Sequence, residues 1–139
     1  MIDDILQEKA GSIERCIVRV RAKYVGHEAE LEHDLDLQDI IVLNLQRACQ
    51  IAIDMGMRKG RLRRLGLPKD SAEIFAILQA AGLLKKELAN SLRRMVGFRN
   101  IAVHEYRKLD LDKVRYIIEH RLDDLLAFSK AMLLADPAP

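Results

Sequence analysis

The residues best suited to chemistry in this chain are gathered in one short stretch. Arg99, Asn100, His104 and Tyr106 stand close together, in a composition with no Trp and few aromatic residues. A histidine ordinarily titrates near neutral pH, so His104 can take a proton from a ribose 2′-hydroxyl or give one to a leaving oxygen. An arginine offers a permanent fork of donors to phosphate oxygens as negative charge grows. These residue types favour metal-independent cleavage of RNA, with Asn100 orienting His104 or binding phosphate.

The positions of these residues on a helix raise a geometric difficulty. At about 100° per residue, Arg99 falls within about 20° of Leu88 on the apolar line, and about 140° from His104. An unpaired arginine on an apolar face is costly, so Arg99 needs a carboxylate, an interface or a cleft. Either the helix breaks near Gly97 or His104, or a second copy of the chain completes the site in a two-fold dimer.

The spacing of these residues also resembles that of a known family. Arg99-Asn100-x-x-x-His104-x-Tyr106 is similar to the R-x4-H-x-Y signature of HepT-like toxins in the HEPN superfamily, and residues 39–54, the chain length and the helix order resemble that family too. A second R-x4-H pair, Arg115 and His120, lacks the Asn and the Tyr, and we expect it to be a chance match.

The resemblance implies a dimeric, all-helical ribonuclease, the toxin of a type II toxin–antitoxin system that cuts mRNA or tRNA. Arg99 and His104 of two copies would form a composite catalytic site in the dimer cleft. A cognate minimal nucleotidyltransferase antitoxin (MntA-like) would neutralise the toxin by attaching AMP to Tyr106. The added negative charge and bulk beside the site make a reasonable off switch.

Other interpretations remain open at this point. A non-catalytic HEPN-like protein that holds a nucleotide, or an accessory subunit of a nucleotidyltransferase, would use the same Arg and His as a phosphate cradle. A helical dimerisation module would have no site at all. In structural roles, Arg99 would pair with an acid such as Asp54, His104 would bond free carbonyls at a helix end, and Tyr106 would pack there.

The elements that must position the site are helical, because apolar residues recur at intervals of three and four. We expect four long helices and one short helix in an up-and-down bundle, with residues 1–135 as a single domain and 136–139 as a frayed tail. Asn44, on the second apolar stripe, needs a buried partner. The expected segments are a helix over 2–24, a helix over 37–55, a loop over 56–69, a short helix over 70–81 opened by an Asp70–Glu73 capping box, a helix from 84 into the motif, and a last helix from Asp110 to Met132.

Basic residues are concentrated in two places that bear on RNA binding. The loop expected over 56–69 is rich in Lys and Arg and contacts RNA phosphates, an acidic partner or only solvent. Arg93, Arg94, Arg107 and Lys108 bracket the motif more closely and form a candidate RNA-binding rim.

Several function classes are disfavoured. The net charge of +2 is too small to imply nucleic-acid binding by itself. Cys16 and Cys49 lie alone on apolar lines and predict buried thiols. The acidic stretch 27–39 has no paired histidines at metal-ligand spacing, so we expect neither metal nor cofactor. Without a long apolar run or a basic N-terminus, the chain is expected to be cytoplasmic, with no membrane association.

Overall fold

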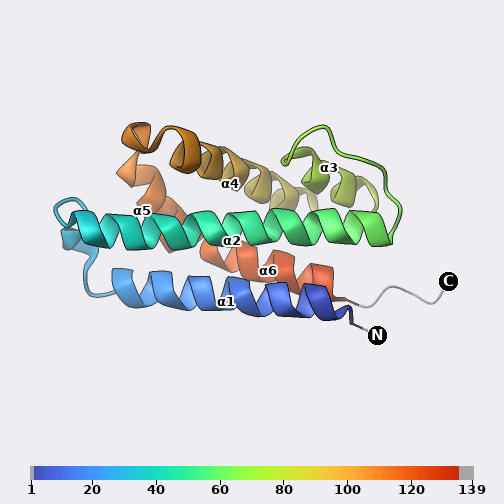
Figure 1. Cartoon of the computed structure of the whole chain (residues 1–139), viewed down its shortest axis with the longest axis horizontal. Coiled ribbons are helices and arrows are strands. Elements are labelled where there is room, and N and C mark those ends of the chain that lie inside the picture. The colour runs from blue at the N-terminus through green and yellow to red at the C-terminus, as the bar shows by residue number, and fades with distance from the viewer. Residues whose placement is uncertain (1, 135–139) are drawn as a thin grey trace.

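Two long antiparallel helices, α1 (Asp4–Tyr24) and α2 (Leu35–Leu62), run side by side along the bundle (Figure 1). This computed structural model describes residues 2–134, so the predicted tail at 136–139 lies outside the described residues. Within them the chain is all-helical and has no strand, which confirms the predicted fold class. The remaining elements are η1 (Glu28–Glu30), α3 (Glu73–Ala80), α4 (Lys86–His104), η2 (Tyr106–Lys108), α5 (Leu111–His120) and α6 (Leu122–Leu133).

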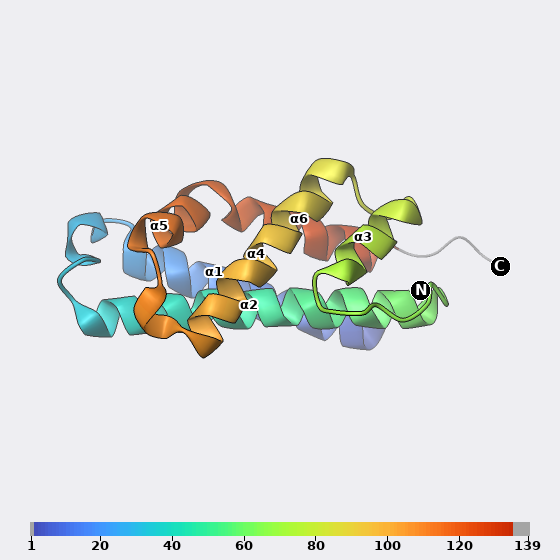
Figure 2. The same cartoon turned by 90° about the horizontal axis from the view of Figure 1, so that it is seen from above.

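Helix α2 is the central element, because it contacts α1, α3, α4 and α6. Seen from above, α4 crosses α2 obliquely and carries its C-terminal end towards the first half of α2 (Figure 2). The expected buried partner of Asn44 is a carbonyl of its own helix, since Asn44 Nδ2 donates to the Ile40 oxygen at 2.8 Å. None of the described helices is both long enough and apolar enough to cross a membrane.

The segment predicted as a loop over 56–69 is helical as far as Leu62, so that prediction is wrong for its first half. Helix α2 continues to Leu62. Gly56 and Gly60 are buried, and a Cβ added at either would lie 3.3 Å or 3.1 Å from a side-chain carbon of Ile74 on α3. These glycines therefore allow α2 and α3 to approach closely, where the sequence pattern suggested that they break the helix.

The basic residues of this segment are correspondingly less available to RNA than expected. Arg58 makes a two-pronged ion pair with Asp3, the N-cap of α1, at 2.9 and 2.7 Å. Lys59 is buried and its Nζ donates to the Leu134 carbonyl at the end of α6. These two cations hold the ends of the bundle together, which leaves the exposed Arg61, Arg64 and Lys69 available for phosphate contacts.

Replacing Gly56 with valine tests the close helix contact. We expect a loss of about 1–3 kcal/mol in the free energy of unfolding, because Ile74 and Leu78 already lie 3.3–3.4 Å from the added Cβ and leave no room for two methyl groups. Urea denaturation followed by circular dichroism measures the change. Gly11→Val on α1 is the matched control, since its Cβ would meet only the mobile end of Arg15. Equal losses in both variants would contradict the packing role.

Two other expectations about the helices need correction. The short helix begins at Glu73, not at 70, and the expected Asp70–Glu73 capping box forms only in part. The Glu73 amide donates to Asp70 Oδ1, but the Glu73 carboxylate accepts from the Lys69 amide and not from the Asp70 amide. The last helix is two helices, α5 and α6, separated at Arg121. Its apolar stripe runs on without a break, so tertiary contacts decide where the helix bends. The predicted N-cap Asp110 is confirmed, because its side chain accepts the Asp112 amide.

Candidate active site

Helix α4 and the 3₁₀ turn after it carry all four motif residues. The helix is continuous through Gly97 and ends at His104, where the Glu105 amide donates to the Ile101 carbonyl. Tyr106 opens η2. Of the two helix breaks considered from sequence, the structure therefore has the one at His104, and Arg99 stays on the regular helix.

Arg99 has no carboxylate partner among the described residues. Its Nη2 donates to Ser71 Oγ at 3.3 Å, and its buried Nε has no hydrogen-bond partner. The pairing with Asp54 considered from sequence is wrong, because Asp54 accepts from Gln50 Nε2 at 3.0 Å and lies 4.0 Å from Lys9 Nζ. A half-satisfied guanidinium is costly to keep, so a purely structural ion pair does not explain Arg99.

The second R-x4-H arginine behaves in the opposite way. Arg115 lies 3.1 Å from Glu32 and also donates to the Glu28 carbonyl at 2.8 Å. Its companion His120 stacks on Tyr116 with ring centroids 4.8 Å apart. Arg115 joins α5 to the connection between α1 and α2, and its donors are occupied. The contrast supports treating only the first pair as a candidate site.

His104 and Asn100 lie on the open face of α4. Both are exposed, and neither side chain makes a hydrogen bond within residues 2–134. The structural role considered for His104, bonding to free carbonyls at the helix end, is therefore not what the structure shows. Arg93 and Gly97 share this exposed face, and a Cβ added at Gly97 would meet nothing within 4 Å. This face is polar and exposed, and it has no side chain at its centre, where Gly97 lies.

Arg99 and His104 are not brought together within one chain. Arg99 reaches towards Ser71, in the segment that precedes α3, whereas His104 is exposed beside η2. The helix remains regular between them, so the separation of about 140° expected from helical geometry is retained. A single copy therefore presents the two groups in different directions.

Tyr106 is tied to the start of α2. Its hydroxyl donates to Asp39 Oδ1 at 2.6 Å, across 67 residues of sequence. Desolvation, and then the adjacent Asp39 carboxylate, raise the pKa of Tyr106 to about 12. The side chain is 42% exposed, so it does not simply pack at a helix end. The hydroxyl is protonated, fixed in place and close to solvent.

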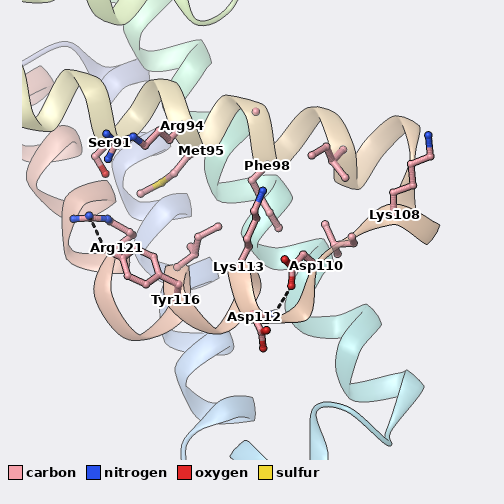
Figure 3. A pocket seen from close by; sticks show the side chains of 14 residues that line it. Ser91, Arg94, Met95, Phe98, Lys108, Asp110, Asp112, Lys113, Tyr116 and Arg121 are labelled. Carbon is pink, nitrogen blue, oxygen red and sulfur yellow. Dashed lines mark hydrogen bonds between the residues drawn. The ribbon is translucent and has the colours of Figure 1, made fainter.

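A cavity of about 590 Å³ lies between α4 and α5, next to the motif (Figure 3). Met95 and Phe98 point into it from α4, and Lys113 and Tyr116 border it from α5. Apolar side chains dominate its lining, whereas charged groups lie around it. The other lining residues are Ser91, Arg94, Gly97, Ile101, Lys108, Leu109, Asp110, Asp112, Ile117 and Arg121.

The predicted basic rim divides into two parts. Arg93, Arg94, Arg107 and Lys108 are all exposed. Arg94 and Lys108 line the cavity between α4 and α5, and Arg93 and Arg107 do not. Arg94 makes no ion pair with any residue in the described range 2–134, so its charge is available to a phosphate.

The cysteines and acidic residues of the described chain are considered as candidate metal ligands. Cys49 is fully buried, and desolvation raises the pKa of its thiol to about 12, which leaves it protonated. Cys16 is only partly buried, so the prediction of two buried thiols holds for one of them. Within residues 2–134 no group of His, Cys, Asp and Glu is arranged to hold a metal ion.

Sequence reasoning missed two partners of the motif residues. Asp39 contacts Tyr106 and Ser71 contacts Arg99, and each partner is distant in sequence. Asp39 was visible only as one of several acids in the stretch 27–39. No local spacing signals these contacts, because both depend on how α2, α3 and α4 pack. The cavity-lining residues of α5 were missed for the same reason.

Comparisons with known proteins place most of the chain in one family. Residues 13–132 match the family Ribonuclease HepT-like. The chain is 39% identical over 127 residues to the mRNA nuclease HepT of Shewanella oneidensis, covering 91% of this chain and 95% of that protein.

Solved structures of related toxins share the fold of this chain. The tri-AMPylated HEPN toxin of Shewanella oneidensis, in complex with an MNT antitoxin, superposes with a TM-score of 0.89 at 38% identity, covering 94% of this chain and 98% of that one. A toxin–antitoxin structure with AMP-PNP also gives 0.89, at 37% identity and with 94% and 99% covered.

Proposed function

Because the chain belongs to the HepT-like ribonuclease family, we propose that it is the toxin of a toxin–antitoxin pair and cuts RNA without a metal ion. The observation that supports this most directly is Arg99. It stands on the packed side of α4 with no carboxylate partner within residues 2–134, and the exposed His104 lies about 1.4 turns further along the same helix. An arginine with no ion-pair partner and a histidine with no side-chain hydrogen bond, both within the described chain, are suited to binding and cleaving a phosphodiester.

The proposed reaction is internal transesterification. His104 takes the proton from the ribose 2′-hydroxyl or gives one to the leaving 5′-oxygen, and the second proton transfer uses the same residue of the other copy or water. The bond from the 2′-oxygen to phosphorus forms as the bond to the 5′-oxygen breaks. Arg99 stabilises the negative charge that grows on the phosphoryl oxygens, and Asn100 supports the geometry.

The site is proposed to be completed by a second copy of the chain. One copy directs Arg99 and His104 apart, so a single phosphate cannot meet both on a regular helix. The open face of α4 with Arg93, Gly97 and Asn100 allows another helix to approach closely. A two-fold dimer packed there would gather two copies of each catalytic residue in one cleft.

Tyr106 is the proposed acceptor of AMP from a minimal nucleotidyltransferase antitoxin. The related Shewanella toxin is AMPylated and bound to an MNT antitoxin. In this chain the Tyr106 hydroxyl is accessible and lies two residues beyond His104. A phosphodiester on that oxygen would add negative charge where an RNA phosphate must bind, and would repel it.

The RNA is proposed to run along α4 and over the cavity beside α5. Arg93, Arg94, Arg107 and Lys108 supply charge for phosphates, and Phe98 and Tyr116 offer apolar and aromatic surface for a base. The loop after α2 contributes only its exposed cations, because Arg58 and Lys59 are engaged within the bundle.

Induction of the chain in bacterial cells, with and without its antitoxin, tests the proposal. We expect growth arrest that the antitoxin relieves, and cleaved RNA with 2′,3′-cyclic phosphate and 5′-hydroxyl ends, because the 2′-hydroxyl is the nucleophile. End-specific ligation and sequencing identify those ends. Products with a 5′-phosphate would contradict the mechanism, and no arrest by soluble, unmodified protein would favour a nucleotide-binding or accessory role.

A further inference from the structure

The Tyr106 hydroxyl already has a proton acceptor in place. Asp39 lies in the second turn of α2 and Tyr106 at the start of η2, and packing brings their side-chain oxygens to 2.6 Å. Asp39 has no other hydrogen bond or ion pair recorded among the described residues, and it is exposed. A carboxylate with a single partner at the solvent boundary can both receive a proton and release it.

We propose that Asp39 of the toxin is a catalytic residue in the modification of Tyr106, taking the phenolic proton as the oxygen attacks the α-phosphate of ATP. This inference rests on the proposed function, which makes Tyr106 the acceptor. The antitoxin binds the nucleotide, and the toxin supplies both the nucleophile and its base. The general base therefore belongs to the toxin, which is the protein that the antitoxin modifies, and not to the antitoxin.

The reaction balances without a further reagent. The Tyr106 oxygen forms a bond to the α-phosphorus as the bond from that phosphorus to the bridging oxygen of the β-phosphate breaks. Pyrophosphate leaves with the bonding electrons, and the phenolic proton moves to the Asp39 carboxylate and then to water. The product is a phosphodiester that joins tyrosine to adenosine, and Asp39 returns to its ionised form.

The electrostatics of the pair favour proton transfer during the attack. The pKa of Tyr106 is raised to about 12, so tyrosinate is scarce near neutral pH. A tyrosinate formed in advance would stand beside the Asp39 carboxylate, and the two negative charges would repel. If the proton moves to Asp39 as the oxygen–phosphorus bond forms, that repulsion is avoided. The same hydrogen bond also directs the hydroxyl, so it is aligned before the nucleotide arrives.

The test uses the full chain mixed with its antitoxin and labelled ATP. Asp39→Asn keeps the size of the side chain but removes the base, so the rate constant for labelling is expected to fall at least about 10²-fold near pH 7. Asp39→Glu is expected to recover part of the rate. The ratio of D39N to wild-type rates, taken at each pH, cancels the titration of the antitoxin.

The pH dependence separates a base from a residue that only orients. Without Asp39 the nucleophile is the small tyrosinate fraction, which grows about tenfold per pH unit below its pKa. The D39N to wild-type ratio should therefore rise steeply between about pH 7 and pH 9. A ratio that is low but constant with pH would overturn the assignment as base, and an unchanged rate in D39N would overturn any role.

Two further variants complete the design. Asp36→Asn removes the same charge one turn earlier on α2, where the side chain is exposed and does not contact Tyr106, and it is expected to be labelled at the wild-type rate. Tyr106→Phe is expected to accept no label. Full labelling of Tyr106→Phe would reject Tyr106 as the acceptor of AMP, and with it the proposed regulation. If D39N is labelled at the normal rate while Tyr106→Phe is not labelled, only the role of Asp39 is rejected.

Discussion

Replacing His104 with alanine is expected to abolish growth arrest and to slow RNA cleavage by about 10²–10⁴-fold, the usual contribution of a general acid or base. The side chain is exposed and no hydrogen bond is recorded for it in the described chain, so its loss should leave the fold unchanged. The rate is measured on a defined RNA with purified protein, and the unfolding midpoint is measured beside it.

His120→Ala is the control for that experiment. His120 ends the second R-x4-H pair and stacks on Tyr116 at the end of α5, away from the motif on α4. We expect this variant to cleave RNA at close to the wild-type rate. If His104→Ala retained full cleavage while His120→Ala lost it, the catalytic pair would be Arg115 and His120, and the proposed site would be wrong.

The second large effect is expected at Arg99. Arg99→Ala should slow cleavage by about 10²–10³-fold, the range found when a donor to developing negative charge is removed. Arg99→Lys should recover only part of this rate, because an ammonium keeps the charge but not the planar fork. The folded state should tolerate either change well, since within the described part of the chain the guanidinium makes only the 3.3 Å bond to Ser71 and its Nε has no partner.

Co-expression of the Arg99→Ala and His104→Ala chains tests whether two copies share a site. In a mixed dimer, the intact Arg99 of one copy can work with the intact His104 of the other. Random association makes about half of the dimers mixed. Each mixed dimer keeps one of its two Arg99–His104 pairs intact, so we expect about a quarter of the wild-type cleavage rate. Each variant expressed alone is the reference.

A failure to recover activity would leave two explanations. If the mixture is as inactive as each variant alone, and mass measurements show mixed dimers present, either the cleft needs the histidines of both copies or Arg99 and His104 of the same chain act together. In the second case the helix end at His104 would have to rearrange on RNA binding. If no dimer forms at all, the composite site itself is excluded.

The helices and the motif were predictable because both depend on the spacing of residues along a short stretch of the chain. Apolar residues at intervals of three and four require helices whatever their neighbours, and caps such as Asp110 act within one turn. Gly56 and Gly60 were misread, because a glycine that breaks a helix and one that admits a neighbouring helix look alike in sequence. Only the position of Ile74 distinguishes the two cases.

The sequence by itself therefore determined the fold class, the candidate residues and the angular conflict between Arg99 and His104, since all three follow from helical periodicity. Tertiary structure alone decided the surroundings of those residues. Among the described residues it gave Arg99 no carboxylate partner, joined Tyr106 to Asp39 across 67 residues, and opened a cavity between α4 and α5. The physical reason is that such contacts depend on how helices pack, and packing distances are not encoded in local spacing.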